Sequence, residues 1–196
     1  MTLCRDITGA FMKYRLPAAD DRQILKEYVE EHYANGERSI SASLGLTGTD
    51  YDAWVEKVNR NSKESDDDWG RYYLYLAFDD SDRLIGLLHI RFDLSCALRE
   101  EYGDIGYGVR PAERRKGYAT EMLRYALDVC REKDMRYAVL GCYENNIGSN
   151  KTIINNGGVL FRQDTEKKAL SEHWEIELKR NYYKIALFSS EYPEKP

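Results

Sequence analysis

The second half of the chain contains the stretch Arg114-Arg115-Lys116-Gly117-Tyr118-Ala119. It directly follows the extended run Gly103-Asp104-Ile105-Gly106-Tyr107-Gly108-Val109-Arg110-Pro111, and it opens a helix. Backbone N–H groups at the start of a helix point outward, and the helix dipole favours negative charge there. Glycine also lets a ligand approach the main chain closely. A strand, a short cationic loop with glycine and a helix start therefore predict a binding loop for a phosphate chain.

The helix that follows, from about Gly117 to Glu132, has the clearest pattern in the chain. Its apolar residues recur at steps of three and four, as on a helix that packs one face against a core. Next come an apolar strand at Tyr137–Cys142, a short helix at Ser149–Asn156 that Gly157-Gly158 ends, and a strand at Val159–Arg162. Counted from the strand before the loop, this β–α–β–α–β order predicts an α/β fold with right-handed crossovers.

The rest of the chain adds strands and two helices to this unit. Strands are predicted at Phe11–Leu16, Tyr72–Phe78, Leu84–Phe92, Tyr102–Val109 and His173–Leu178. Helices are predicted from Asp20 to about Tyr33 and at Asp50–Val58, with a long loop at Asn35–Thr49 and a partly helical connection at Asp93–Glu101. Gly103, Gly106 and Gly108 are unusual inside a strand, which indicates a bulge or a close approach of backbones.

The composition is that of one ordinary globular domain. With 196 residues, of which 42% are hydrophobic and 32% charged, the chain is long enough for one core and short for two. We expect a single domain over residues 1–196, with extensions at 1–10 and 179–196. The stretch Tyr182–Phe188 is a candidate for an added strand that pairs the subunits of a homodimer. No run approaches the roughly 20 apolar residues of a membrane span, and no signal peptide precedes the fold, so we expect a cytoplasmic protein without a membrane partner.

Charge and cysteine usage exclude two further classes. The net charge of −5 argues against nucleic acid as a partner, because such binders are normally basic. Cys4, Cys96, Cys130 and Cys142 form no C-x-x-C pair and have no histidine cluster near them, so no metal site is expected. The patterns around Cys130 and Cys142 indicate buried thiols in a reducing compartment.

Three motifs together resemble the GNAT superfamily of acyl-CoA-dependent N-acetyltransferases. They are the strand from Gly103 to Pro111, the Arg-x-x-Gly-x-Ala loop from Arg114 to Ala119, and Asn146-Ile147-Gly148-Ser149 followed by Gly157-Gly158. The loop alone occurs often by chance, whereas all three in this order on these elements are specific. The resemblance covers most of the chain from Phe11 to Leu178. It implies an α/β GNAT-like fold, with a mixed central sheet of about six or seven strands and about four flanking helices.

The resemblance also implies an acetyl-CoA site. Main-chain groups of Tyr107 and Val109 would pair with the pantetheine arm, and the N–H of Val109 would polarise the thioester carbonyl. N–H groups from about Arg115 to Thr120 would hold the pyrophosphate, with Asn146 and Ser149 beside the pantetheine. The implied cofactor-binding residues are Tyr107, Val109, Arg114, Arg115, Lys116, Gly117, Tyr118, Ala119, Thr120, Asn146 and Ser149. The implied reaction moves an acetyl group to a primary amine, of a small molecule or a peptide, by direct attack in a ternary complex.

The acid and base are where the sequence departs from the family. Many members carry a tyrosine on the short helix seven residues after the Asn, where this chain has Ile153. The histone-acetylating branch has a glutamate where this chain has Gly103. Other branches have an acidic residue at the position of Asp104, which makes Asp104 a candidate catalytic base. Tyr102 and His89 are further candidates.

Several residues also have simpler interpretations. The basic loop can be a solvated turn or, less fittingly, a nucleic-acid patch, although Glu113 and Glu121 dilute its charge. His89 shares a strand face with Arg91 and either lines a pocket or is structural, and Asp104 either acts as a base or bonds a neighbouring strand. The departures above also leave a second hypothesis, a non-catalytic CoA-binding regulatory or interaction module.

Overall fold

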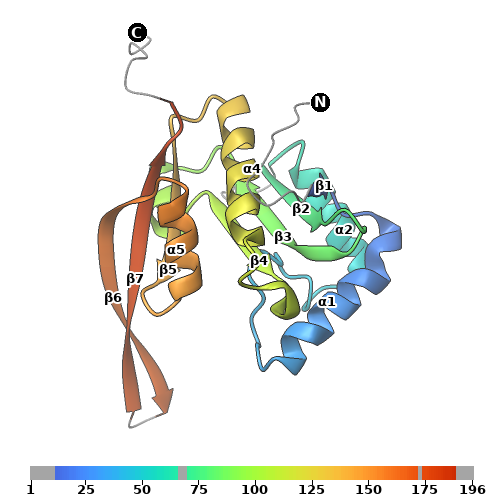
Figure 1. Cartoon of the computed structure of the whole chain (residues 1–196), viewed down its shortest axis with the longest axis horizontal. Coiled ribbons are helices and arrows are strands. Elements are labelled where there is room, and N and C mark those ends of the chain that lie inside the picture. Colours follow the sequence, from blue (N-terminus) through green and yellow to red (C-terminus); the bar gives the residue numbers. More distant parts are fainter. Residues whose placement is uncertain (1–11, 66–69, 172–173, 189–196) are drawn as a thin grey trace.

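The computed structural model describes residues 12–65, 70–171 and 174–188, which contain seven strands and five α-helices. The strands form two sheets that lie side by side (Figure 1). The first has the order β1 (Lys13–Arg15), β2 (Tyr72–Phe78), β3 (Leu84–Arg91), β4 (Ile105–Val109). The second has the order β5 (Tyr137–Tyr143), β7 (Trp174–Ala186), β6 (Val159–Ser171). The predicted α/β fold with six or seven strands is confirmed. All hydrogen-bonded pairs among the described strands are antiparallel, so the strands form two antiparallel sheets where one mixed central sheet was predicted.

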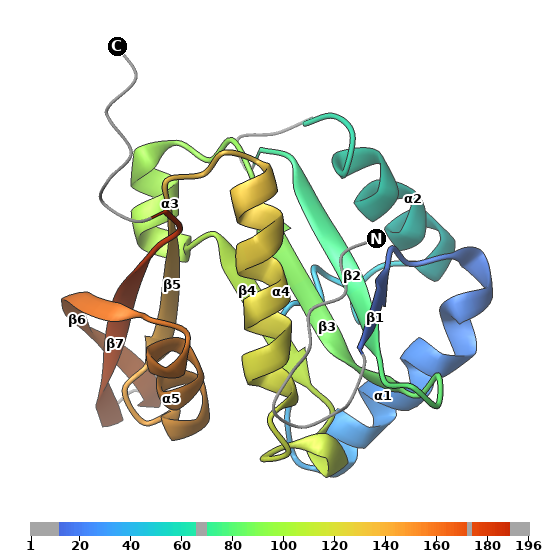
Figure 2. The same ribbon diagram turned by 45° about the horizontal axis from the view of Figure 1, so that its top comes forward.

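The helices are α1 (Arg22–Ala34), α2 (Tyr51–Asn61), α3 (Cys96–Tyr102), α4 (Tyr118–Glu132) and α5 (Ile147–Asn155). In Figure 2, α4 runs along β3 and β4, with α5 beside it against the second sheet. The apolar stripe of α4 is buried against both sheets and α5, as its pattern predicts. On the opposite face of the first sheet, α1 and α2 pack with β2 and β3 in a separate core. The first sheet is therefore covered on both faces.

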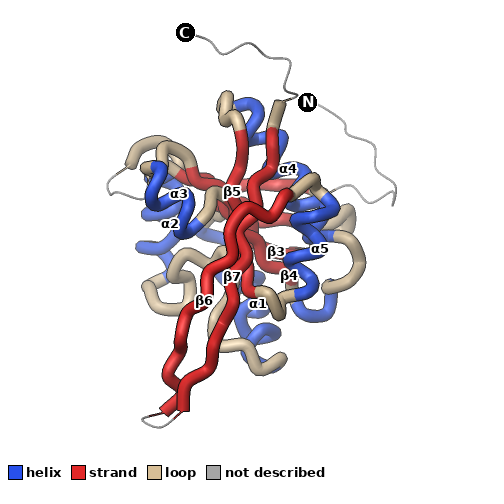
Figure 3. Tube along the Cα trace, turned by 90° about the vertical axis from the view of Figure 1, so that its left-hand side faces the viewer, coloured by secondary structure: helices blue, strands red, loops and turns tan. Residues whose placement is uncertain are grey.

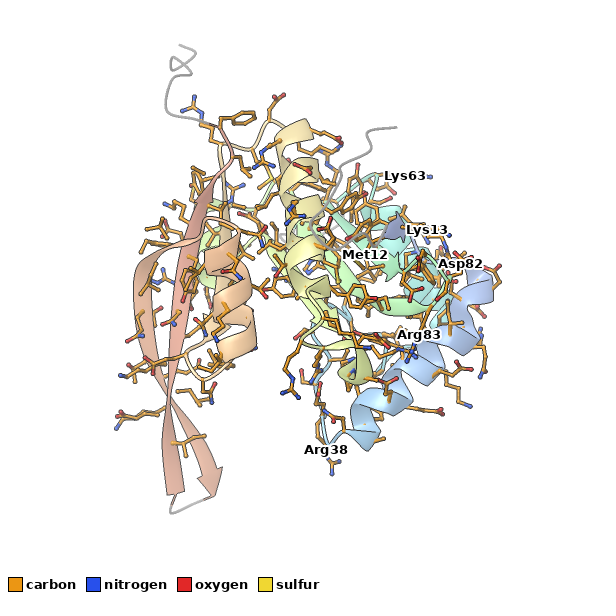
Figure 4. All side chains as sticks on the ribbon, in the orientation of Figure 1. Met12, Lys13, Arg38, Lys63, Asp82 and Arg83 are labelled. Carbon is orange, nitrogen blue, oxygen red and sulfur yellow. The ribbon has the colours of Figure 1, made fainter. Side chains whose placement is uncertain are left out.

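The loop between α1 and α2 is fixed onto this second face. Trp54 of α2 is fully buried and its indole N–H donates to the carbonyl of Ser43, at 3.1 Å. A Cβ on Gly108 of β4 would stand only 2.7 Å from the carbonyl oxygen of Ser41. Glycine is therefore required there, which confirms the close approach that the glycine-rich strand predicts. At the far edge of the sheet, Lys13 of β1 pairs with Asp82 of the β2–β3 turn at 2.7 Å, as Figure 4 labels them.

The two sheets meet at one joint, between the start of β4 and the middle of β5. Asp104 N–H donates to the carbonyl of Val139 at 2.7 Å, and Val139 N–H donates to Asp104 Oδ2 at 2.8 Å. Gly103, at φ +76°, lets the chain pass there, because a Cβ would lie 2.9 Å from the Val139 oxygen. Beyond the joint, β4 and β5 belong to different sheets and share no ladder. Main-chain groups of both strands are thereby left available for a ligand.

Three predicted elements differ from the structure. Tyr102 is the last residue of α3 and is not part of a strand. With α3, the described residues contain five α-helices, where about four were expected. The predicted strands Val159–Arg162 and His173–Leu178 are shorter than the strands of the structure. Val159–Arg162 is the start of β6 and residues 174–178 are the start of β7, in a long hairpin that runs past the body of the molecule (Figure 3); His173 lies outside the described residues. The stretch Tyr182–Phe188, considered as a subunit-pairing strand, instead pairs with β5 of the same chain from Tyr182 to Ala186. Charged residues on both faces of β6, such as Asp164 and Lys167, hide its alternation from sequence analysis.

Candidate active site

A cavity of about 1320 Å³ lies where β4 and β5 separate. Its lining includes the loop before α4 and the start of that helix, together with the loop after α1. Parts of β3 and β7 also line it. The start of α5 forms a side wall. The cavity thus connects the predicted phosphate loop with the opposite face of the two sheets.

The loop before α4 has the geometry of an anion site. Gly117 stands at φ +90° and a Cβ there would meet nothing within 4 Å, so the space above it is open. The helix begins at Tyr118, and the first N–H groups of a helix have no acceptor within it. The N–H of Thr120 is the exception, because it donates to Gly117 O at 3.0 Å. Of the residues predicted here, all except Lys116 line the cavity.

The cationic side chains of this loop are largely paired within the protein. Arg114 donates to both oxygens of Glu37, at 2.6 and 2.8 Å, and its Nε donates to the carbonyl of Val109. This guanidinium holds the pKa of Glu37 down to about 2. Lys116 pairs with Glu113 at 2.8 Å. Arg115 is exposed and has no ion pair with any described residue, so it is the loop cation best placed to meet a phosphate.

The main chain of β4 faces the cavity at the predicted positions. Arg110 N–H donates to Ile85 O of β3 at 2.8 Å. Because backbone groups alternate along a strand, the N–H and C=O groups of Tyr107 and Val109 point away from β3, toward β5. The Tyr107 hydroxyl lies 2.9 Å from Ser149 Oγ, and burial raises its pKa to about 12. Ser149 N–H in turn donates to Asn146 Oδ1 at 3.1 Å, as the cap of α5.

His89 lies on the opposite face, beside Gly106. Its Nδ1 would be 3.4 Å from a Cβ at Gly106, and the ring meets Tyr72 edge-on. The side chain is 3% exposed and lines the cavity, while its Nε2 has no hydrogen-bond partner. Burial lowers the pKa of His89 well below 6.5, and the charge of Arg91 lowers it further. The imidazole is therefore neutral near pH 7. Its ring lines the cavity, while Nε2 is enclosed by protein and has no hydrogen-bond partner among the described residues.

This burial predicts a pH dependence of stability. Between the depressed pKa of folded His89 and its usual value of 6.5, the unfolded chain binds more protons, so stability falls as the pH drops below 6.5. The loss attributable to one such group is at most about 1.4 kcal/mol per pH unit. Urea unfolding from pH 7 down to about pH 5 should show a steeper loss for the wild type than for His89→Gln. Parallel curves for the two proteins would contradict this origin.

Asp104 and Tyr102 differ in their access to the cavity. The carboxylate of Asp104 is fully buried, accepts the Val139 N–H and pairs with Arg99 Nε at 2.9 Å. It does not line the cavity, and burial raises its pKa. These contacts match the structural interpretation of Asp104, the bond to a neighbouring strand. Tyr102 lines the cavity and is 39% exposed, and a hydrogen bond with Glu101 raises its pKa.

Family comparison agrees with this arrangement. The family described as the acetyltransferase (GNAT) family matches residues 44–153, more than half of the chain. The chain belongs to the GNAT family. It is thus a GNAT acetyltransferase by family, and acetyl-CoA is the cosubstrate of that family, as the three motifs predict. The matched range includes all the predicted cofactor-binding residues as well as His89, Tyr102 and Asp104. A search of curated proteins finds no match.

Solved structures show the same fold at low sequence identity. The yncA protein from Salmonella typhimurium, solved with its cofactor acetyl-CoA, is 17% identical with a TM-score of 0.62, covering 94% of this chain and 99% of its own. An N-acetyltransferase from Staphylococcus aureus Mu50 is 16% identical, with a TM-score of 0.62 and coverage of 91% and 99%. A GNAT acetyltransferase from Streptococcus pneumoniae is 15% identical, with a TM-score of 0.64 and coverage of 89% and 100%. The shared GNAT fold therefore spans nearly the whole chain.

No helix within the described residues has the length and apolar character that a membrane crossing requires. The buried thiols predicted at Cys130 and Cys142 are confirmed, at 0% and 8% exposure. Cys4 lies outside the described residues. Sequence analysis missed two residues of the site. Glu37, in the loop after α1, accepts hydrogen bonds from Arg114, and Arg180 of β7 lines the cavity.

Proposed function

We propose that this GNAT protein transfers the acetyl group of acetyl-CoA to a primary amine by direct attack in a ternary complex. The observation that supports this most is the continuity of the cavity. It joins the open loop at Gly117 to the opposite face of the sheets, where the neutral imidazole of His89 is part of its lining. A donor entering from one side and an acceptor from the other would meet beside β4 without any covalent enzyme intermediate.

The residues present fit acetyl-CoA. The N–H groups of Tyr118 and Ala119, with the side chain of Arg115, would hold the pyrophosphate above Gly117. The main chain of Tyr107 and Val109 would pair with the pantetheine amides, as an added strand does at a sheet edge. The amide NH₂ of Asn146 is also available to the arm, since its oxygen accepts from Ser149. The bound molecule supplies a thioester, whose carbonyl carbon an amine can attack.

Three groups of the chain would assist the transfer. The N–H of Val109 would donate to the oxygen on which negative charge develops. Neutral His89 would accept a hydrogen bond from the amine and pass its proton on through water, since a depressed pKa makes it a weak final proton acceptor. The Tyr107 hydroxyl, held by Ser149, would donate a hydrogen bond to the departing thiolate, in place of the helix tyrosine that Ile153 replaces.

The test is thiol release from acetyl-CoA across a panel of primary amines, together with calorimetry of acetyl-CoA binding. We expect acetyl-CoA to bind and at least one class of amine to be acetylated, with the acetylated product identified by mass. His89→Phe should lower kcat with little change in the affinity for acetyl-CoA. Binding of acetyl-CoA without turnover of any amine would instead identify a non-catalytic CoA-binding module.

A further inference from the structure

Arg180 of β7 lines the cavity, and its guanidinium lies 5.3 Å from the centroid of the Tyr182 ring on the same strand. The register places Asp164 of β6 directly opposite Arg180, yet Asp164 pairs with Arg162 at 3.1 Å. The guanidinium of Arg180 lies across Gly141 of β5, where a Cβ would be 3.1 Å from its Nε and 3.3 Å from its Nη2. Both residues line the cavity. The absence of a side chain at Gly141 thus gives this cation its position.

A second arginine lines the same end of the cavity. Arg91 of β3 donates through Nη1 to the carbonyl of Gly103 at 2.9 Å, which fixes its guanidinium. Burial lowers the pKa of Arg91. The charge of Asp104 raises this pKa, and the charge of Arg180 lowers it. Gly103, to which Arg91 is bonded, packs against β5, since a Cβ at Gly103 would lie 3.5 Å from the N atom of Gly141. Because Arg180 lies across Gly141, the two guanidiniums line the same part of the cavity.

The carboxylates on this face have other partners. Glu166 accepts a hydrogen bond from the Tyr143 hydroxyl and Glu144 accepts one from Gln163, while Asp164 forms an ion pair with Arg162. Among the residues that the structure describes, none forms an ion pair with Arg180. A carboxylate bound between the two guanidiniums would form charge-assisted hydrogen bonds with both.

His89 lies two residues before Arg91 on the same face of β3. Two residues along a strand span about 6.8 Å, and His89, Arg91 and Arg180 all line the cavity, so the imidazole and the two guanidiniums are within reach of one small molecule. One end of that molecule would be anionic and the other would carry the reacting amine.

We propose that the acceptor is a small amine that carries a carboxylate, as an amino acid does, with the carboxylate held by Arg91 and Arg180 and the amine beside His89. This inference rests on the proposed function and names the substrate class of the same site. Arg180 acts here as a residue that determines specificity and is not needed for binding of acetyl-CoA.

The first experiment compares amines that differ only in the anionic group. Each amino acid that is turned over would be matched with its primary amide, its decarboxylated amine and its aminophosphonate. We expect kcat/KM to fall by about 10- to 100-fold when the carboxylate is replaced by a neutral group, the usual effect of losing charge-assisted hydrogen bonds. Equal turnover of charged and neutral acceptors would overturn the inference and leave the proposed function standing.

The second experiment uses Arg180→Gln, with Lys179→Gln as the matched control. Lys179 is the exposed neighbour on the other face of β7 and does not line the cavity. Arg180→Gln should raise KM for the amino acid about 10- to 100-fold, while turnover of the decarboxylated amine and affinity for acetyl-CoA stay unchanged. Lys179→Gln should change none of these values. An equal effect of Arg180→Gln on both acceptors overturns the inference, whereas a wild type that binds acetyl-CoA and acetylates nothing refutes the proposed function and this inference with it.

Discussion

Gly117→Val should weaken acetyl-CoA binding by about 100-fold or more while leaving the protein folded. Two charge-assisted hydrogen bonds from main-chain N–H groups to a phosphate contribute about 3 kcal/mol, which corresponds to that factor. A valine would occupy the open space above residue 117 and would resist φ +90°, so the loop would both shift and be obstructed. Isothermal titration calorimetry with acetyl-CoA measures the loss directly.

Gly157→Val is the matched control. Gly157 also stands at positive φ, +84°, with nothing within 4 Å of a Cβ, but it follows α5 and does not line the cavity. Both substitutions should cost a similar ~1–2 kcal/mol of stability from the left-handed backbone. Only Gly117→Val should weaken the binding of acetyl-CoA by about 100-fold or more. Wild-type affinity in Gly117→Val would mean that the diphosphate is held elsewhere.

Asp104→Ala should lower the free energy of unfolding by about 3 kcal/mol. It would remove the acceptor of the Val139 N–H and the partner of Arg99 at the one joint between the two sheets. Asp104→Asn should lose less, because an amide oxygen still accepts the Val139 N–H. Urea unfolding monitored by circular dichroism gives these values, and Asp128→Ala, which breaks a half-exposed pair with Arg131 on α4, should cost under about 1 kcal/mol.

The same variants separate a structural Asp104 from a catalytic one. Asparagine cannot take up the amine's proton, so a base at this position would lose activity in Asp104→Asn as completely as in Asp104→Ala. If Asp104 instead holds β4 to β5, Asp104→Asn should keep most of the kcat and only its melting temperature should fall. A stable but inactive Asp104→Asn enzyme would restore the candidate base that the sequence first indicates.

Local sequence predicted much of the donor side of this site. The apolar stripe of α4, the glycine before it and the short helix α5 depend on residues a few positions apart, so their geometry follows from short-range propensities. For the same reason the sequence predicted α2, whose cap in the structure is Asp50, which accepts from the N–H groups of Asp52 and Ala53. Each of these elements is found within about three residues of its predicted position.

The amino-acid sequence by itself determined the phosphate loop, the order of strands and helices, and the family to which they belong. Only the tertiary structure decided what individual side chains do. It gave Arg114 to Glu37, 77 residues away, joined Asp104 to Val139, and laid Arg180 across Gly141. The physical reason is that a partner for a buried charge is chosen by which segments the fold brings together, and spacing along the chain carries no record of that choice.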